Sequence, residues 1–374
     1  MKKNILCVLV LLSTSISSDK VGNFAFSLYK ELEKKDSISF VVSPSSIYSA
    51  LFMACLGAGN GTKKEILEVL SIDHIPNMPA DFFVSSSPSI LQANSVWLQE
   101  EYRIKDTYLS SLSFFFENEV LRANFSEYPN KSRLKINSWI AESTNNKVQS
   151  LLKPNDISRR TRLVLVNALY MLSNWKKAFE RSKTASKDFF LLNGTIKLPT
   201  MHLRDRMIFF EDGHLKSISL ELEDSLLFTV ILPNSNTMMR YVESNLDISY
   251  FNLILKSSKF YDVDFSMPKI NLDYSISLKD HLISMGVNQA FIDGKANFSN
   301  IRDENDLTIS DVLHQSTLSL DEEGVEASSA TAVVIRVKTT AKKKRKEFKA
   351  NRPFIFIISD QKNNLIHFMG KFSG

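Results

Sequence analysis

The amino-acid sequence predicts a single α+β domain in which helices pack around β-sheets. Apolar residues recur at helical spacing through much of the first 150 positions. From residue 187 to residue 268, short runs alternate between apolar and polar side chains, as antiparallel strands do. No linker-like stretch and no internal repeat separates these two parts, so one domain is favoured over two.

The first 90 residues predict three helices and a loop. Residues 19–34 place apolar side chains at helical spacing with charges between them. A second helix should run from Pro44 to one of the glycines at 57 and 59, and it should be central because it is apolar nearly all round. Residues 61–72 predict an amphipathic helix. Residues 73–90 contain three prolines, which favours a loop with at most one helical turn.

The middle of the chain predicts alternating strands and helices. In order, we expect a strand at 91–99, a helix at 102–116, a strand at 118–125 and a helix at 132–152. The last of these helices should fray at Asn145 and Asn146. Residues 161–172 form a continuous aliphatic and β-branched run, which is typical of a strand buried on both faces.

The C-terminal part is predicted to be rich in strands. Hairpin-like connections join the alternating runs between residues 187 and 268. A helix is then expected at 275–287 and a strand at 307–320. Residues 348–360 and 364–372 should close the chain as a hairpin.

The first 18 residues have the pattern of a secretory signal peptide. Two lysines precede an apolar run over residues 5–12, and a zone of small residues follows. This run is too short to cross a bilayer, and no later segment reaches the roughly 20 apolar residues that crossing requires. We therefore expect residues 1–18 to be removed, and residues 19–374 to form an extracellular domain with no membrane partner.

Cysteines and charges constrain the mature chain further. Cys7 would leave with the signal, so Cys55 would remain alone, without an internal disulfide, as a buried and inert thiol. Eight basic residues and one acidic residue lie between Arg336 and Lys349, so positive charge is concentrated there. Asn-x-Ser/Thr triplets mark candidate glycosylation sites at Asn60, Asn124, Asn130, Asn193 and Asn297.

Sequence patterns for catalysis are missing from the chain. There is no His-Glu-x-x-His, no paired Cys-x-x-Cys and no Gly-x-Ser-x-Gly, so we expect neither a metal site nor an enzyme. Residues 57–64 fail the spacing of a phosphate loop. The basic run Lys342, Lys343, Lys344, Arg345 and Lys346 fits a solvated loop, a cleavage site for enzymes that cut after basic residues, or a site for sulfated polysaccharides. Export argues against a nucleic-acid partner.

Residues 321–334, DEEGVEASSATAVV, fit either a loop or a strand. The stretch is proline-free, and after Gly324 it is built mainly of Ala, Ser and Thr with one charge. In a strand, Val325 and Thr331 would share one face with the other odd-numbered residues, and Glu326 would lie on the opposite face. An edge strand and a flexible loop both satisfy this composition.

Several stretches carry a resemblance to a known family. They include SPSSIYSALFMACLGAGNGTKKEI from Ser43, LVNALYMLSNW from Leu165, VLHQSTLSLDEEGVEA from Val312 and FKANRPFIFII from Phe348. In this order they resemble the serpin family over nearly all of residues 19–374. The resemblance implies one domain with helices packed around three β-sheets and an exposed reactive-centre loop at about 322–347.

The resemblance also implies a mechanism, that of a secreted suicide-substrate inhibitor. A serine protease attacks the loop and forms an acyl-enzyme, and the loop then inserts into the main sheet as a strand. The expected partner is a trypsin-like serine protease in a covalent complex with a monomeric inhibitor. No cofactor is required, although a heparin-like sulfated glycosaminoglycan is a candidate. The alternative is a non-inhibitory serpin that acts as a carrier, a chaperone or a polysaccharide-binding protein.

The resemblance assigns roles to individual residues. The hinge of the loop would comprise Glu322, Gly324, Val325, Glu326, Ala327, Ser328, Ser329, Ala330 and Thr331. Counting along the loop places the reactive bond at Lys338–Thr339, with alternatives at Arg336, Lys342, Lys343, Lys344, Arg345 and Lys346 because the following segment is slightly long. The polar cluster beneath the insertion path and the aromatic residue above it would be Ser43, Ser46, Asn167, His314 and Trp175. Polyanions would bind at residues 342–346.

Overall fold

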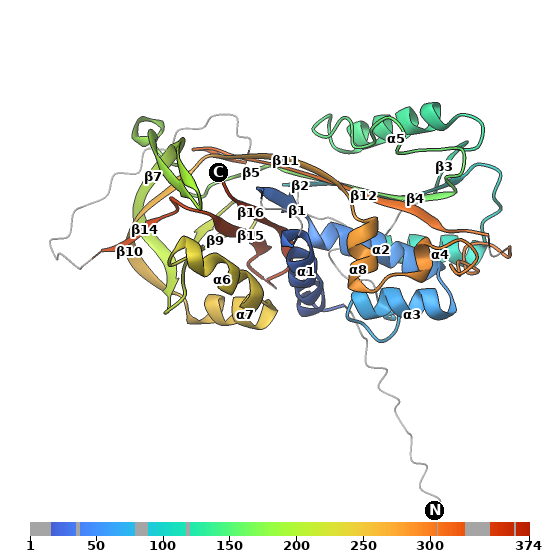
Figure 1. Cartoon of the computed structure of the whole chain (residues 1–374), viewed down its shortest axis with the longest axis horizontal. Helices are drawn as coiled ribbons and strands as arrows, with labels where there is room; N and C mark the ends of the chain where they lie inside the picture. Colours follow the sequence, from blue (N-terminus) through green and yellow to red (C-terminus); the bar gives the residue numbers. More distant parts are fainter. Residues whose placement is uncertain are drawn as a thin grey trace, which may run out of the picture.

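The computed structural model describes residues 16–34, 38–78, 89–116, 120–304, 306–325, 345–362 and 364–374. Its α-helices are α1 (Ser18–Glu33), α2 (Pro44–Gly57), α3 (Asn60–Val69), α4 (Asp106–Phe116), α5 (Pro129–Ser143), α6 (Met239–Asn245), α7 (Ile248–Ser257) and α8 (Lys279–Met285). Figure 1 shows α1, α2, α3, α4 and α8 on one side of a long sheet and α5 on its other side. No helix in the described part of the chain is long and apolar enough to cross a membrane.

Helix α2 lies at the centre of the fold, as its uniform apolar character predicts. Every residue from Pro44 to Cys55 is buried, and α2 packs against the main sheet, α1 and α3. Pro44 occupies the first turn, where its missing N–H is not needed. The predicted burial of Cys55 is confirmed: its thiol is free and fully buried, and burial raises the pKa of this thiol to about 12.

Within the described residues, the main sheet has seven strands in the order β3-β2-β4-β12-β13-β5, with β11 paired to β12. These strands are β2 (Ile90–Gln99), β3 (Leu121–Ala123), β4 (Leu163–Met171), β5 (Ser173–Asn174), β11 (Ile270–Ser277), β12 (Ile309–Leu320) and β13 (Gly324–Val325). Strand β4 is buried on both faces, as predicted. Leu163 and Leu165 join the core around α2, whereas Val164 and Val166 join a separate core under α5.

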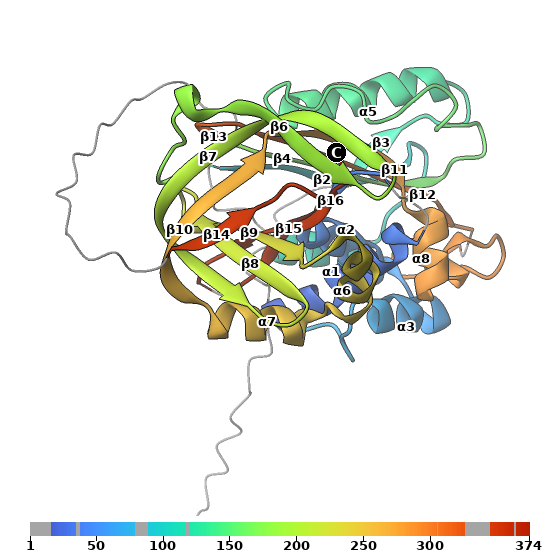
Figure 2. The same ribbon diagram turned by 60° about the vertical axis from the view of Figure 1, so that its left-hand side comes forward.

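The second sheet has nine strands in the part of the chain that the structure describes, in the order β1-β16-β15-β9-β8-β7-β10-β14, with β6 paired to β7. They are β1 (Phe40–Val42), β6 (Ala185–Leu191), β7 (Gly194–Glu211), β8 (Leu215–Glu221), β9 (Leu226–Pro233), β10 (Lys259–Pro268), β14 (Lys346–Lys349), β15 (Phe354–Asp360) and β16 (Ile366–Phe372). Strand β7 is 18 residues long, pairing first with β6 and later with β8. The three expected sheets therefore form two hydrogen-bonded networks in the described chain, because β7 joins two of them (Figure 2).

Two predicted helices have different boundaries in the structure. Helix α5 ends at Ser143 instead of continuing to residue 152, because Asn145 and Asn146 adopt left-handed backbone angles, with φ of 50° and 61°. Helix α8 begins only at Lys279, since the residues before it belong to β11. The closing hairpin of β15 and β16 is confirmed.

Helices α6 and α7 interrupt the part of the chain that the sequence predicted as strands. Helix α7 buries Ile248, Phe251 and Ile254, which are three residues apart, on one face. The Asp247 side chain caps it by accepting a hydrogen bond of 2.7 Å from the Tyr250 N–H. The sequence does not predict this helix, because the segments around its apolar face and its N-cap alternate strongly between apolar and polar residues, as strands do.

A buried ionic cluster joins α1, α6 and β16. Lys371 Nζ lies 2.7 Å from Glu243 Oε1 and 4.0 Å from Glu33 Oε1, and the Tyr29 hydroxyl donates to Glu243 Oε1 at 3.2 Å. Glu243 is only 3% exposed. Burial, opposed by Lys371 and reinforced by Glu33, raises the pKa of Glu243 to about 7.

This pKa predicts a loss of stability as the pH rises. The folded chain holds the Glu243 proton more tightly than the unfolded chain, so the stabilisation is present below about pH 4.5 and is lost by about pH 7, an effect on the order of 3 kcal/mol. Glu243→Gln should flatten the dependence of the unfolding free energy on pH between 5 and 8, measured by urea denaturation. Parallel curves for the two proteins would contradict this assignment.

Candidate functional site

The described end of the hinge is already a strand of the main sheet. Gly324 and Val325 form β13, which pairs antiparallel with β12 through Leu320 and antiparallel with β5 through Ser173 and Asn174. The hinge therefore starts between two strands that lie on either side of it. This position is the mouth of the candidate site.

Below this mouth, β4 and β12 pair directly with each other, and we call this pair the seam. They run parallel, with register from Ile309 opposite Leu163 to Thr317 opposite Tyr170. The seam and the short edge pair β2–β3 are parallel, whereas the pairs β2–β4, β11–β12, β12–β13 and β13–β5 are antiparallel. A strand that continued β13 downward would have to separate β4 from β12.

Gly324 is required by the geometry of the mouth. Its φ is +140°, and a Cβ placed there would lie 2.4 Å from Ser173 O and 2.5 Å from Asn174 Cα. Both neighbours are backbone atoms, so no side-chain rotation could relieve the contact. The close approach of β13 to β5 depends on this glycine.

Gly324→Ala should destabilise the native protein by at least about 2 kcal/mol, because it combines a forbidden backbone angle with a backbone clash. Gly213→Ala is the matched control, since a Cβ at Gly213 meets nothing within 4 Å. Denaturant unfolding of both variants measures the difference. Equal stability of the two variants would show that the mouth does not need this glycine.

Polar contacts fix the chain that leads into the mouth. Glu322 is 3% exposed, and its carboxylate binds Lys269 Nζ at 2.6 Å and the Thr184 hydroxyl at 2.6 Å. Burial acts to raise the pKa of Glu322, but these two partners lower it overall. Glu323 forms an ion pair with Arg181. The carboxylates of Glu322 and Glu323, which lie in the turn between β12 and β13, are thus both held by side chains from neighbouring segments.

Trp175 covers the mouth. Its indole N–H donates to Asp321 O at 2.8 Å, and its backbone N–H donates to Glu323 O at 2.9 Å. The ring is 4% exposed and packs edge-on against Phe179 and Phe228, with centroid distances of 5.6 and 5.5 Å. Trp175, to which the resemblance assigned a place above the insertion path, thus contacts the chain directly before β13.

His314 links the two strands of the seam. The Ser43 N–H donates to His314 Nε2 at 3.2 Å, so Nε2 carries no proton and Nδ1–H donates to Asn167 Oδ1. The Ser316 hydroxyl lies 2.8 Å from the same Nε2. The ring is fully buried, and burial lowers the pKa of His314 to about 3, so the imidazole is neutral.

The hydrogen bonds continue from Asn167 to the N-terminus of α2. Asn167 Nδ2 donates to the Ser46 hydroxyl and to Asn94 Oδ1, and Ser46 in turn donates to Asn94 at 2.8 Å. The structure thus brings together Ser43, Ser46, Asn167 and His314, the four residues that the resemblance implied to be one polar cluster. Asn94 and Ser316 complete this cluster and were overlooked. The signal for Asn94 was its amide within an otherwise buried strand.

Most of the predicted loop lies outside the described residues. This applies to the hinge residues Glu326, Ala327, Ser328, Ser329, Ala330 and Thr331, to the reactive bond Lys338–Thr339, and to Arg336, Lys342, Lys343 and Lys344. The structure describes the last two basic residues of the run. Arg345 is exposed, and Lys346 begins β14, pairs with Glu211 and lies 5.5 Å from the ring centroids of Phe209 and Tyr261.

The candidate glycosylation sites differ in their surroundings. Asn193 lies at the exposed turn between β6 and β7, and Asn60 and Asn130 are also exposed. Asn124 and Asn297 use their side-chain oxygens within the fold, accepting from Glu127 N at 3.0 Å and from Ser299 N at 3.1 Å respectively. Among the described residues, no cluster of His, Cys, Asp and Glu could hold a metal ion.

The fold and the site together define a class of protein. A single α+β domain of these two sheets and the helices around them, with β13 between β12 and β5 in the main sheet, has the serpin fold. A family model described as Serpin (serine protease inhibitor) matches residues 19–374. The chain belongs to the serpin family.

Individual relatives extend this comparison. An uncharacterised serpin-like protein of Thermococcus kodakarensis is 33% identical over 362 residues, which cover 94% of this chain and 84% of that protein. Human serpin B4 is 30% identical over 386 residues, covering 95% of this chain and 98% of its own length. The crystal structure of Serpin48, a highly specific serpin in the insect Tenebrio molitor, has 26% identity and a TM-score of 0.84, covering 96% of this chain and 97% of its own.

Proposed function

We propose that this serpin is a secreted suicide-substrate inhibitor of trypsin-like serine proteases. The observation that carries the proposal is the position of β13, antiparallel to both β12 and β5 and directly above the parallel seam. After a protease cuts the loop, the hinge would continue β13 downward between β4 and β12. The acyl-enzyme attached to the loop would travel with it.

Insertion would replace one ladder of hydrogen bonds by two. The seam is a parallel ladder, whereas the inserted strand would be antiparallel to both neighbours, and antiparallel pairing is somewhat more stable per residue. Each added hydrogen bond contributes about 1 kcal/mol net. Ordering the hinge costs backbone entropy, and burial of its apolar side chains offsets that cost further. The composition of the hinge, small and free of proline, favours the same outcome.

The register of β13 indicates where each hinge residue would lie after insertion. Val325 lies opposite Leu320 in β12 and Ser173 in β5. Continuing both registers downward puts Thr331 between His314 and Asn167, which are themselves partners across the seam. A residue with a short polar side chain suits this position, because it can bond to either neighbour.

Specificity would come from a lysine or arginine at the cleaved bond. Counting from Glu322 places the bond at Lys338–Thr339, and a trypsin-like pocket accepts the cationic side chain of Lys338. The alternative at Lys346 has less support, since this residue is the first of β14 and pairs with Val263 of β10. A protease needs an extended and accessible segment, which a paired strand does not offer.

Incubation with trypsin tests the proposal. The expected product is a covalent complex that survives denaturant, together with a C-terminal peptide that begins at Thr339. This peptide should separate only after denaturation, because it contains the buried strand β15. Complete cleavage without a complex would reject inhibition, whereas a peptide that begins elsewhere would reject only the assignment of the bond.

The location of the protein and its polyanion partner belong to the same proposal. Helix α1 begins at Ser18, so removal of the first 17 or 18 residues would leave the helix nearly intact.

The basic run that ends at Lys346 supports a heparin-like polysaccharide as an accelerating partner. Rates of complex formation with and without heparin test this point.

A further inference from the structure

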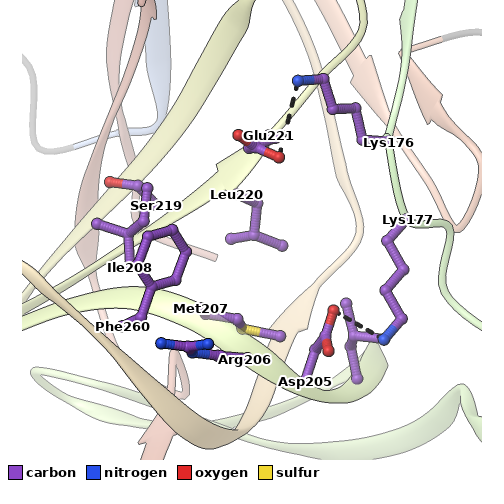
Figure 3. A pocket seen from close by; sticks show the side chains of 11 residues that line it. Lys176, Lys177, Asp205, Arg206, Met207, Ile208, Ser219, Leu220, Glu221 and Phe260 are labelled. Atoms are coloured by element: carbon purple, nitrogen blue, oxygen red, sulfur yellow. Dashed lines mark ion pairs between the residues drawn. The ribbon is translucent and has the colours of Figure 1, made fainter. Parts of the chain in front are cut away.

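An open hollow lies on the second sheet, where β7, β8 and β10 meet the chain that follows Trp175 (Figure 3). Its volume is about 450 Å³, including the space at its mouth. Met207 and Leu220 form a floor that is almost buried, with exposures of 5% and 6%. The ring of Phe260 stands at the side and is 56% exposed, which leaves an aromatic face in contact with solvent.

Charged side chains surround this apolar floor. Lys177 Nζ lies 2.7 Å from Asp205 Oδ2, and this carboxylate is mostly buried. Lys176 Nζ lies 3.7 Å from Glu221 Oε2, and both of these side chains are 47% exposed. The first pair is tight, whereas the second is loose and contributes little to stability. Lys176 can therefore turn to another anion at small cost.

Arg206 carries a positive charge that no ion pair neutralises among the described residues. Its guanidinium lies 5.3 Å from the ring centroid of Phe260. Asp262 stands opposite Arg206 in the register of β7 and β10, yet no carboxylate among the described residues forms an ion pair with this arginine. The rim thus carries three cations against two carboxylates, and both carboxylates already have a lysine partner.

We propose that the hollow binds a small organic anion with an apolar body. The body would cover Met207 and Leu220 and pack against Phe260, and the anionic group would bind Arg206 with help from Lys176. A site with an apolar floor and a few polar groups at its rim is the usual form of a small-ligand site. An organic cation is disfavoured because Asp205 and Glu221 are occupied. The proposal for this site does not rest on loop insertion or on the proposed inhibition.

Binding of 8-anilinonaphthalene-1-sulfonate to the native mature protein tests the proposal by fluorescence titration. N-phenyl-1-naphthylamine, which has the same rings without the sulfonate, serves as the neutral comparison. We expect one saturable site for the sulfonate, with affinity about tenfold higher than that of the neutral compound. Arg206→Ala and Phe260→Ala should each weaken sulfonate binding by about tenfold.

Arg204→Ala is the matched control, because Arg204 lies on the same strand, is 60% exposed and pairs with Asp264 outside the hollow. It should bind the sulfonate as the wild type does. All three side chains are exposed, so the variants should fold, which circular dichroism verifies. Equal affinity for the charged and neutral compounds, equal loss in Arg204→Ala and Arg206→Ala, or the absence of saturable binding would each overturn the proposal.

Discussion

Thr331→Arg is expected to convert the inhibitor into a substrate. Trypsin should still cut the loop, but the yield of covalent complex per cleaved inhibitor should fall at least about tenfold, because a buried unpaired charge costs several kcal/mol. Residue 331 lies outside the described residues, and its expected place follows from the register of β13. There, the new guanidinium would meet the buried His314 and Asn167.

Glu326→Arg provides the matched control for this experiment. The same register puts residue 326 on the opposite face of the inserted strand, between Ser319 and Leu172, which are both partly exposed. This variant should form the complex at nearly the wild-type yield. Densitometry of denaturing gels, with trypsin in limiting amount, measures both products. Equal yields for the two arginine variants would show that the register is wrong.

Acid should destabilise the native seam through His314. The pKa of about 3 in the folded protein lies well below the value of about 6.5 in an unfolded chain. The unfolded chain therefore takes up a proton first, and stability falls as the pH drops from about 6.5 toward 3. Between pH 7 and pH 4.5 the loss should be about 3 kcal/mol.

His314→Gln isolates this contribution, because glutamine does not titrate. The variant should be less stable than the wild type at pH 7, since the hydrogen bonds from Ser43 and to Asn167 are disturbed. Its unfolding free energy should, however, change less between pH 7 and pH 4.5. A variant curve that runs parallel to the wild-type curve would exclude His314 as the titrating group.

Local patterns in the sequence were sufficient for the elements that have a uniform environment. Helix α2 and strand β4 are buried on all sides, so their apolar runs identify them directly. Helix α7 and the early end of α5 were harder to predict. Only three buried apolar residues mark α7, and only two asparagines with left-handed backbone angles mark the end of α5. Such small signals compete with stronger alternation in neighbouring segments.

The site could be predicted only in part because its parts are distant in the chain. His314 and Asn167 are 147 residues apart, and their pairing depends on the parallel contact of β4 with β12. No local pattern specifies that contact, and the resemblance to serpins supplied it. Asn94 was overlooked for the same reason, since its partners Ser46 and Asn167 come from α2 and β4.

Hydrogen exchange of the hinge tests the central claim most directly. The claim is that residues 326–337 become a strand between β4 and β12 after the loop is cut. Mass spectrometry should compare amide exchange in this segment between the intact protein and its covalent complex with trypsin. The account predicts exchange at least about 100-fold slower in the complex, as expected for paired strands in a sheet. Equal exchange rates in the two states would contradict insertion.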